Sequence, residues 1–126
     1  MSHVEAISPE RAAELVKDGA VLIDIRETYE YASENIPGAR HHALSQIDAK
    51  HPVREGDTVL IFHCKSGMRT KMNAKKLAAR AGDCDVYVLG GGIQAWKRAG
   101  LPTSAPARGN GGGQTGLLGR LVALFR

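Results

Sequence analysis

One segment of the 126-residue chain constrains its fold more than any other, because an apolar run, a polar loop and a helical pattern follow one another directly. Residues 59–62 are Val-Leu-Ile-Phe, which is typical of a buried strand in a parallel sheet. The polar loop opens on Cys64 and closes on Arg69, and residues 71–81, rich in alanine, lysine and leucine, then favour a helix. A cysteine is therefore expected where a central strand ends and a helix begins.

The composition of this loop favours a reactive cysteine over a structural one. At a turn from strand to helix, backbone N–H groups converge and the positive end of the helix dipole points toward the side chain. Lys65 and Arg69 add two cations close to Cys64. These effects favour the thiolate, which is the nucleophilic form of cysteine. An inert, buried cysteine is the alternative, but a glycine and two cations in one short loop are not a core composition.

The rest of the chain predicts an α/β fold. Ser8 and Pro9 are typical of a helix N-terminus, and an apolar run at 20–25 follows that helix as a strand. A further strand is expected at 85–89 and a last helix at 92–98. We therefore expect one domain with a mainly parallel sheet of about five strands and helices on both of its faces.

Four motifs, in order, resemble the rhodanese family of sulfurtransferases, including the rhodanese domain of membrane-associated members. The resemblance covers about residues 4–102 and rests on the Cys64–Arg69 loop, Leu22-Ile-Asp-Ile-Arg26, Ile36-Pro-Gly-Ala39, and residues 89–96 with 99–102. Two positions depart from the family pattern. Glu34-Asn35 stands where Gly-His is common, and Gly90 stands where a charged residue is frequent. Both departures concern the entrance of the pocket and not the nucleophile.

The resemblance implies a thiosulfate sulfurtransferase that needs no cofactor and no metal. Cys64 would take the sulfane sulfur of thiosulfate or a similar small anionic donor, hold it as a persulfide, and pass it to a thiol or to cyanide. The donor would be bound by the residues that follow the nucleophile: Lys65, Ser66, Gly67, Met68, Arg69 and Thr70. Three residues outside the loop would support it without touching the donor: Asp24, Arg26 and Arg40.

Two other functions remain open from the sequence. A persulfide carrier or interaction module with little turnover would keep the same cysteine and loop. A cysteine phosphatase is less favoured, because phosphatases with a related loop place five residues between cysteine and arginine, whereas four separate Cys64 from Arg69. A phosphatase also needs a general acid, and the first acidic residue after the loop is Asp83.

Charge is distributed unevenly along the chain, whose net charge is +4. Residues 1–63 contain 6 Lys/Arg and 11 Asp/Glu, whereas residues 64–126 contain 11 Lys/Arg and 2 Asp/Glu. The basic residues after the loop would attract small anions, or they form only a solvated helix face. Nucleic acid is not an expected partner, because no aromatic residues alternate with these charges. The N-terminus has no signal-peptide pattern and no apolar run spans a bilayer, so we expect a cytoplasmic protein.

The last part of the chain changes character. We expect the sulfurtransferase-like domain to cover 1–102, a flexible Gly-rich linker to cover 103–115, and a short apolar amphipathic tail to cover 116–126. The tail is interpreted as a disordered end, a dimer contact, or a weak membrane contact. In each case, activity with small substrates is expected not to depend on it.

Overall fold

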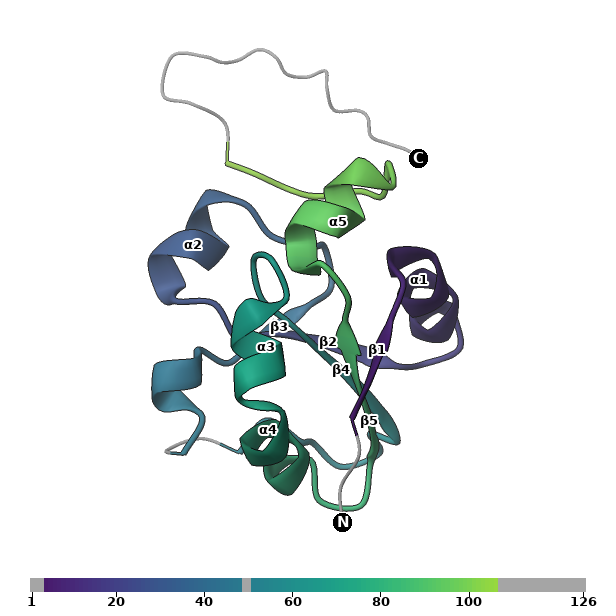
Figure 1. Ribbon diagram of the computed structural model, residues 1–126, viewed down its shortest axis with the longest axis vertical. Coiled ribbons are helices and arrows are strands. Elements are labelled where there is room, and N and C mark those ends of the chain that lie inside the picture. Colours follow the sequence, from purple (N-terminus) through teal and green to yellow (C-terminus); the bar gives the residue numbers. More distant parts are fainter. Residues whose placement is uncertain (1–3, 49–50, 107–126) are drawn as a thin grey trace.

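A computed structural model describes residues 4–48 and 51–106, which form a five-stranded sheet covered by helices (Figure 1). In chain order the elements are β1 (Glu5–Ile7), α1 (Pro9–Lys17), β2 (Val21–Asp24), α2 (Thr28–Ser33), β3 (Arg40–His41), the 3₁₀ turn η1 (Leu44–Gln46), β4 (Val59–His63), α3 (Met68–Met72), α4 (Ala74–Arg80), β5 (Asp85–Leu89) and α5 (Gly92–Arg98).

The sheet is parallel throughout, with the strand order β1-β5-β4-β2-β3. β4 is the central strand. After β4 the chain crosses to β5 on one side of the sheet, whereas after β2 it crosses to β3 on the other side. In open α/β sheets, binding sites form where the connections diverge in this way, beyond the carboxyl ends of the strands. Asp24 ends β2 opposite His63 at the end of β4, and Cys64 follows directly. The topology therefore places Cys64 at the divergence of the sheet.

The side chains of the central strands alternate between two apolar clusters, one on each face of the sheet. Leu22 and Ile61 pack with residues of α1 and α5, whereas Ile23, Leu60 and Phe62 pack with residues of α4 and η1. Figure 1 shows α1 and α4 on opposite sides of the sheet. Because both faces of the sheet are covered, β4 is apolar at nearly every position. The predicted α/β fold with helices on both faces is confirmed.

Most of the predicted elements are present, and the differences have local causes. The helix expected at 71–81 is divided into α3 and α4 at Asn73, whose side-chain Nδ2 donates to the carbonyl of Arg69 at 2.8 Å. Such a side-chain bond competes with regular helix geometry. Strand β1 was not predicted, because three residues at the edge of a sheet are too short to show a period.

The hydrogen-bonded domain extends slightly beyond residue 102. Ser104 exchanges two backbone hydrogen bonds with Asn35, of 2.7 and 2.8 Å, and the Thr103 hydroxyl donates to Glu34 Oε2 at 2.6 Å. These two residues, assigned to the linker from the sequence, are thus attached to the segment after α2. The proposed tail at 116–126 lies outside the described residues. Within the described ranges, no helix is both long enough and apolar enough to cross a bilayer.

Candidate active site

Cys64 lies at the base of a tight loop between β4 and α3, and its side chain is buried. The backbone N–H of Gly67 donates to Cys64 Sγ over 3.1 Å. The Thr70 hydroxyl lies 3.9 Å from the same sulfur and donates to the Gly67 carbonyl at 3.0 Å. A backbone donor that points at Sγ stabilises negative charge on that sulfur. The loop thus directs a backbone N–H group at the Cys64 sulfur atom.

Helix α5 fixes the orientation of the peptide groups that follow Cys64. The N–H of Ile93 donates to the Cys64 carbonyl at 2.9 Å, and the N–H of Gln94 donates to the Lys65 carbonyl at 3.1 Å. Because C=O and N–H point in opposite directions in a trans peptide, the N–H groups of Lys65 and Ser66 are turned away from α5. The first turn of α5 therefore determines where the donors of the cysteine loop point.

Two glycines permit this close packing. Gly67 has a φ of +96°, and a Cβ there would lie 3.1 Å from the backbone nitrogen of Gly91. Gly92 has a φ of +61°, and a Cβ there would lie 2.5 Å from the carbonyl oxygens of both Cys64 and Lys65. Both positions favour glycine because their φ is positive; in addition, a side chain at Gly92 would collide with the cysteine loop, and one at Gly67 would crowd Gly91. The glycine run at 90–92 is therefore part of the construction of the site.

Arg69 is bound to a residue that the sequence did not indicate. Its guanidinium forms a bidentate pair with Glu30 of α2, with distances of 2.7 and 2.8 Å. The hydrogen bonds from Arg69, together with one from the backbone of Glu27, outweigh burial and lower the pKa of Glu30 to about 2. The same pair raises the pKa of Arg69. Arg69 is thus already neutralised by Glu30 at the rim of the loop.

Asp24 and Arg26 form a buried ion pair beneath the site. Both Asp24 oxygens accept from the Arg26 guanidinium, over 2.8–3.2 Å, and one also accepts from the Arg26 backbone at 2.9 Å. His63 lies beside this pair, with Nε2 at 3.8 Å from Asp24 Oδ2 and Nδ1 at 3.4 Å from the Cys64 carbonyl. Burial lowers the pKa of His63. His63 therefore lies between Asp24 and the Cys64 backbone, in an environment that favours its neutral form.

Arg40 has other partners. It forms a bidentate pair with Asp57, at 2.6 and 2.8 Å, and donates to the Pro52 carbonyl at 3.2 Å. The hydrogen bonds from Arg40 lower the pKa of Asp57 to about 2. Asp57 precedes β4 and so lies at the opposite end of that strand from Cys64. The contacts of Arg40 therefore stabilise the start of β4, in contrast to the support of the cysteine loop expected from the sequence.

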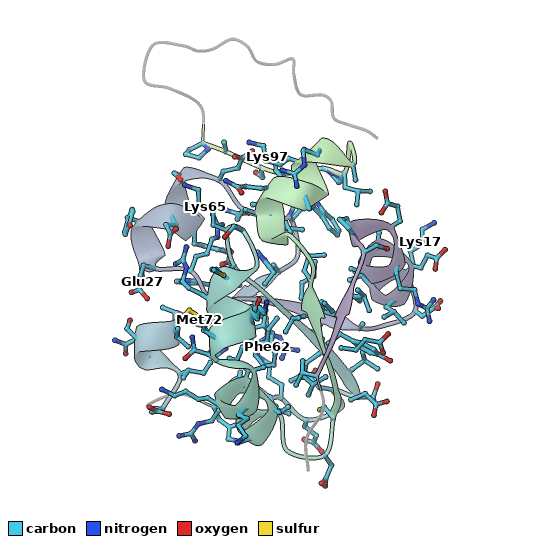
Figure 2. The ribbon with its side chains drawn as sticks, in the orientation of Figure 1. Lys17, Glu27, Phe62, Lys65, Met72 and Lys97 are labelled. Carbon is cyan, nitrogen blue, oxygen red and sulfur yellow. The ribbon has the colours of Figure 1, made fainter. Side chains whose placement is uncertain are left out.

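Two of the four basic residues that follow Arg69 are paired; the four are Lys71, Lys75, Lys76 and Arg80. Asp48 binds both Lys76 Nζ at 3.2 Å and Arg80 Nη2 at 2.7 Å. Lys65 and Ser66 are exposed at the loop (Figure 2 labels Lys65). Among the basic residues of the loop, α3 and α4, those that are exposed and form no ion pair with a described residue are Lys65, Lys71 and Lys75. Any attraction of small anions would therefore depend on these three residues.

The fold and the cysteine loop place the chain in a known family. Residues 8–99 match the rhodanese-like domain, and this protein belongs to that family. The chain is 37% identical over 100 residues to the thiosulfate sulfurtransferase GlpE of Ectopseudomonas mendocina, and the match covers 77% of this chain and 88% of that protein. Proteins of the same name from Pseudomonas fluorescens strains are 34% identical.

Solved structures of related proteins show the same architecture. A thiosulfate sulfurtransferase from Pseudomonas aeruginosa matches with a TM-score of 0.69 and 27% identity, covering 82% of this chain and 20% of that chain. A protein of unknown function from Rhodopseudomonas palustris, described as a possible tyrosine phosphatase, matches with a TM-score of 0.65 and 26% identity, covering 80% and 85%.

The pair between Glu30 and Arg69 predicts a specific dependence of stability on pH. The folded-state pKa of Glu30, about 2, lies below its ordinary value of 4.5, so the pair stabilises the fold above pH 4.5 and loses that effect as the pH falls toward 2. Urea unfolding between pH 2 and 7 should show Glu30→Gln less stable than the unmodified protein at neutral pH, with the difference vanishing near pH 2. A constant difference across this range would show that Glu30 acts through packing instead.

Proposed function

We propose that this protein is a sulfurtransferase that moves a sulfane sulfur from thiosulfate, or a similar small anionic donor, to a thiophilic acceptor through a persulfide on Cys64. The observation that carries the proposal is the bond from the Gly67 N–H to Cys64 Sγ, in a loop whose neighbouring peptides are held by α5. The likeness to thiosulfate sulfurtransferases supports the same reaction.

The reaction takes place in two displacements. The Cys64 thiolate attacks the sulfane sulfur of thiosulfate, the sulfur–sulfur bond of the donor breaks, and sulfite leaves with the electron pair. A nucleophile such as cyanide then attacks the outer sulfur of the persulfide, which yields thiocyanate and restores the thiolate. Dividing the transfer into two steps predicts ping-pong kinetics. Sulfite is a stable anion, so the first step needs no general acid.

The loop supplies binding and charge stabilisation in this scheme. Loop N–H groups, with that of Gly67 already on Sγ, would stabilise the anionic persulfide. Because Arg69 is bound to Glu30, Lys65 is the side-chain cation of the loop that remains available to the donor. Ser66, Met68 and Thr70 complete the wall of the loop, with Thr70 held by its bond to Gly67. The donor would therefore meet mostly backbone donors and one lysine.

The proposal is tested by intact-mass measurement after incubation with thiosulfate. The unmodified protein should gain one sulfur atom, lose it on addition of cyanide, and release thiocyanate over many turnovers. Cys64→Ser should neither gain sulfur nor form thiocyanate, whereas Cys84→Ser, which alters the other cysteine, should do both. Loading of Cys64 without repeated thiocyanate formation would instead support a persulfide carrier.

The same preparation distinguishes the phosphatase candidate. Four residues between Cys64 and Arg69 form a smaller ring than five would, and no carboxylate is present in the loop to protonate a leaving alkoxide. Hydrolysis of aryl phosphates is therefore expected to be negligible. Sustained phosphatase turnover by protein whose Cys64 carries no sulfur would contradict the proposed reaction.

A further inference from the structure

Exposed apolar side chains gather at one side of the cysteine loop. Among the described residues, four large hydrophobic side chains are exposed: Tyr29 at 76%, Met68 at 59%, Met72 at 77% and Val16 at 37%. Three of them lie beside the loop. Met68 is the first residue of α3, Met72 follows one turn later on the same face, and Tyr29 precedes Glu30, which holds Arg69. We call Tyr29, Met68 and Met72 the α2–α3 surface.

The chemistry of a small anionic donor does not explain this surface. Thiosulfate and cyanide gain nothing from thioether or phenol groups in water, whereas exposed apolar patches of this kind usually mark contacts with another macromolecule. Methionine is common on such surfaces because its flexible thioether adapts to different partners. In Figure 2, Lys65 and Met72 both lie near α3, on the opposite side of the picture from Lys17 on α1.

The charges around the α2–α3 surface indicate the kind of partner. Lys65, Lys71 and Lys75 are exposed and form no ion pair with a described residue. The nearby acids of α2 are already engaged, since Glu30 binds Arg69 and Glu27 accepts from the Ser45 hydroxyl at 2.8 Å. A surface with exposed apolar side chains, in a segment of chain that also carries exposed lysines without ion pairs to described residues, is complementary to an acidic protein surface.

We propose that the α2–α3 surface docks an acidic protein whose exposed cysteine receives sulfur from Cys64. This inference depends on the proposed function, because it names the acceptor of the same site. The cysteine thiolate of the partner attacks the outer sulfur of the Cys64 persulfide, the bond between the two sulfurs breaks, and Cys64 leaves as a thiolate. The partner then carries the persulfide, and no other oxidant or reductant is consumed.

Two synthetic cysteine pentapeptides serve as probes. Both have a central cysteine flanked by leucines, and the terminal residues are glutamates in one and lysines in the other. Protein loaded with sulfur by thiosulfate is mixed with each peptide, and the rate of sulfur loss from Cys64 is followed by mass and expressed per thiolate. At low salt the acidic peptide should react about tenfold faster than the basic one. The difference should shrink at about 1 M salt, where the Debye length is about 3 Å.

Three variants separate docking from chemistry. Met72→Gln should slow transfer to both leucine-containing peptides by removing apolar contact, and Lys75→Glu should reduce the preference for the acidic peptide severalfold. Val16→Gln changes an exposed apolar residue on α1, which packs on the opposite face of the sheet from α4, and should leave both rates unchanged. Met72→Gln and Val16→Gln should load with sulfur and release it to cyanide at the rate of the unmodified protein.

The outcomes distinguish this inference from the function on which it depends. Failure of Cys64 to load with sulfur from thiosulfate would overturn the proposed sulfurtransferase reaction. Normal loading and normal release to cyanide, with equal rates for the two peptides, would overturn the docking proposal alone. Unchanged peptide rates in Met72→Gln, together with weakened binding of that variant to phosphatidylserine vesicles, would show a lipid-binding surface and would equally overturn it.

Discussion

Gly92→Ala is expected to lower sulfur transfer by at least about a hundredfold, because misplacement of reacting groups by about 1 Å has effects of this size. The added Cβ would lie 2.5 Å from the carbonyl oxygens of Cys64 and Lys65, and α5 donates hydrogen bonds to both oxygens. The helix and the cysteine loop therefore cannot keep their present separation. The left-handed backbone adds a strain of about 1–3 kcal/mol. Thiocyanate formation measures the loss of sulfur transfer, and urea unfolding measures the cost of the backbone strain.

Gly82→Ala is the matched control for this prediction. Gly82 has the same φ of +61°, but a Cβ there would have no neighbour within 4 Å. The two variants should therefore share the cost of the backbone conformation, and only Gly92→Ala should lose the ability to load sulfur. Equal activity in both variants would show that the loop tolerates a shift of α5, contrary to the role that we assign to Gly92.

Asp24→Ala is expected to lower the free energy of unfolding by about 3–5 kcal/mol, the range observed when one partner of a buried ion pair is removed. Asp24 and Arg26 are both buried, and the guanidinium would lose every carboxylate acceptor while remaining enclosed. Its remaining bond, to the Glu34 carbonyl at 2.6 Å, does not neutralise the charge. Urea unfolding near pH 7 measures the loss, which is large enough to threaten folding of a domain of this size.

Asp48→Ala provides the contrast, since Asp48 also pairs with cations but lies exposed at the surface. That variant should unfold at nearly the same urea concentration as the unmodified protein. Asp24→Asn keeps the shape of the side chain and removes only the charge. Its free energy of unfolding should lie between those of Asp24→Ala and Asp48→Ala. If Asp24→Ala were as stable as Asp48→Ala, Arg26 must reach solvent or another acceptor, and the pair would not stabilise the base of the site.

Local patterns were sufficient to predict most of the fold. The apolar run of β4, the limits of β5 and α5, and the Ser8 cap of α1 depend on neighbours in sequence, and the structure has them as predicted. The position of Cys64 at the end of β4 was predictable for the same reason. β1 and the break at Asn73 were missed because one is too short and the other results from a single side-chain bond.

The partners of the charged residues could not be predicted in this way. Glu30 lies 39 residues from Arg69 along the chain, and only the folded arrangement of α2 against the loop brings them together. The local pattern around Glu30 is a capping box with Glu27, which indicates the start of a helix and not a role at the site. Likewise, nothing local showed that Arg40 would bind Asp57, which lies 17 residues further along the chain.

The attachment of residues 103 and 104 has a consequence for anything joined to this domain. Trp96 Nε1 donates to the Pro102 carbonyl at 2.8 Å, and Ser104 is bonded to Asn35, so the chain leaves the domain near the end of α2 (Figure 1). A module fused after residue 106 would start close to the C-terminal end of α2. Its encounter with Cys64 would be intramolecular, at an effective concentration that a short flexible linker raises to the millimolar range. The exit point of the chain thus makes this domain suited to serve a tethered acceptor ahead of free ones.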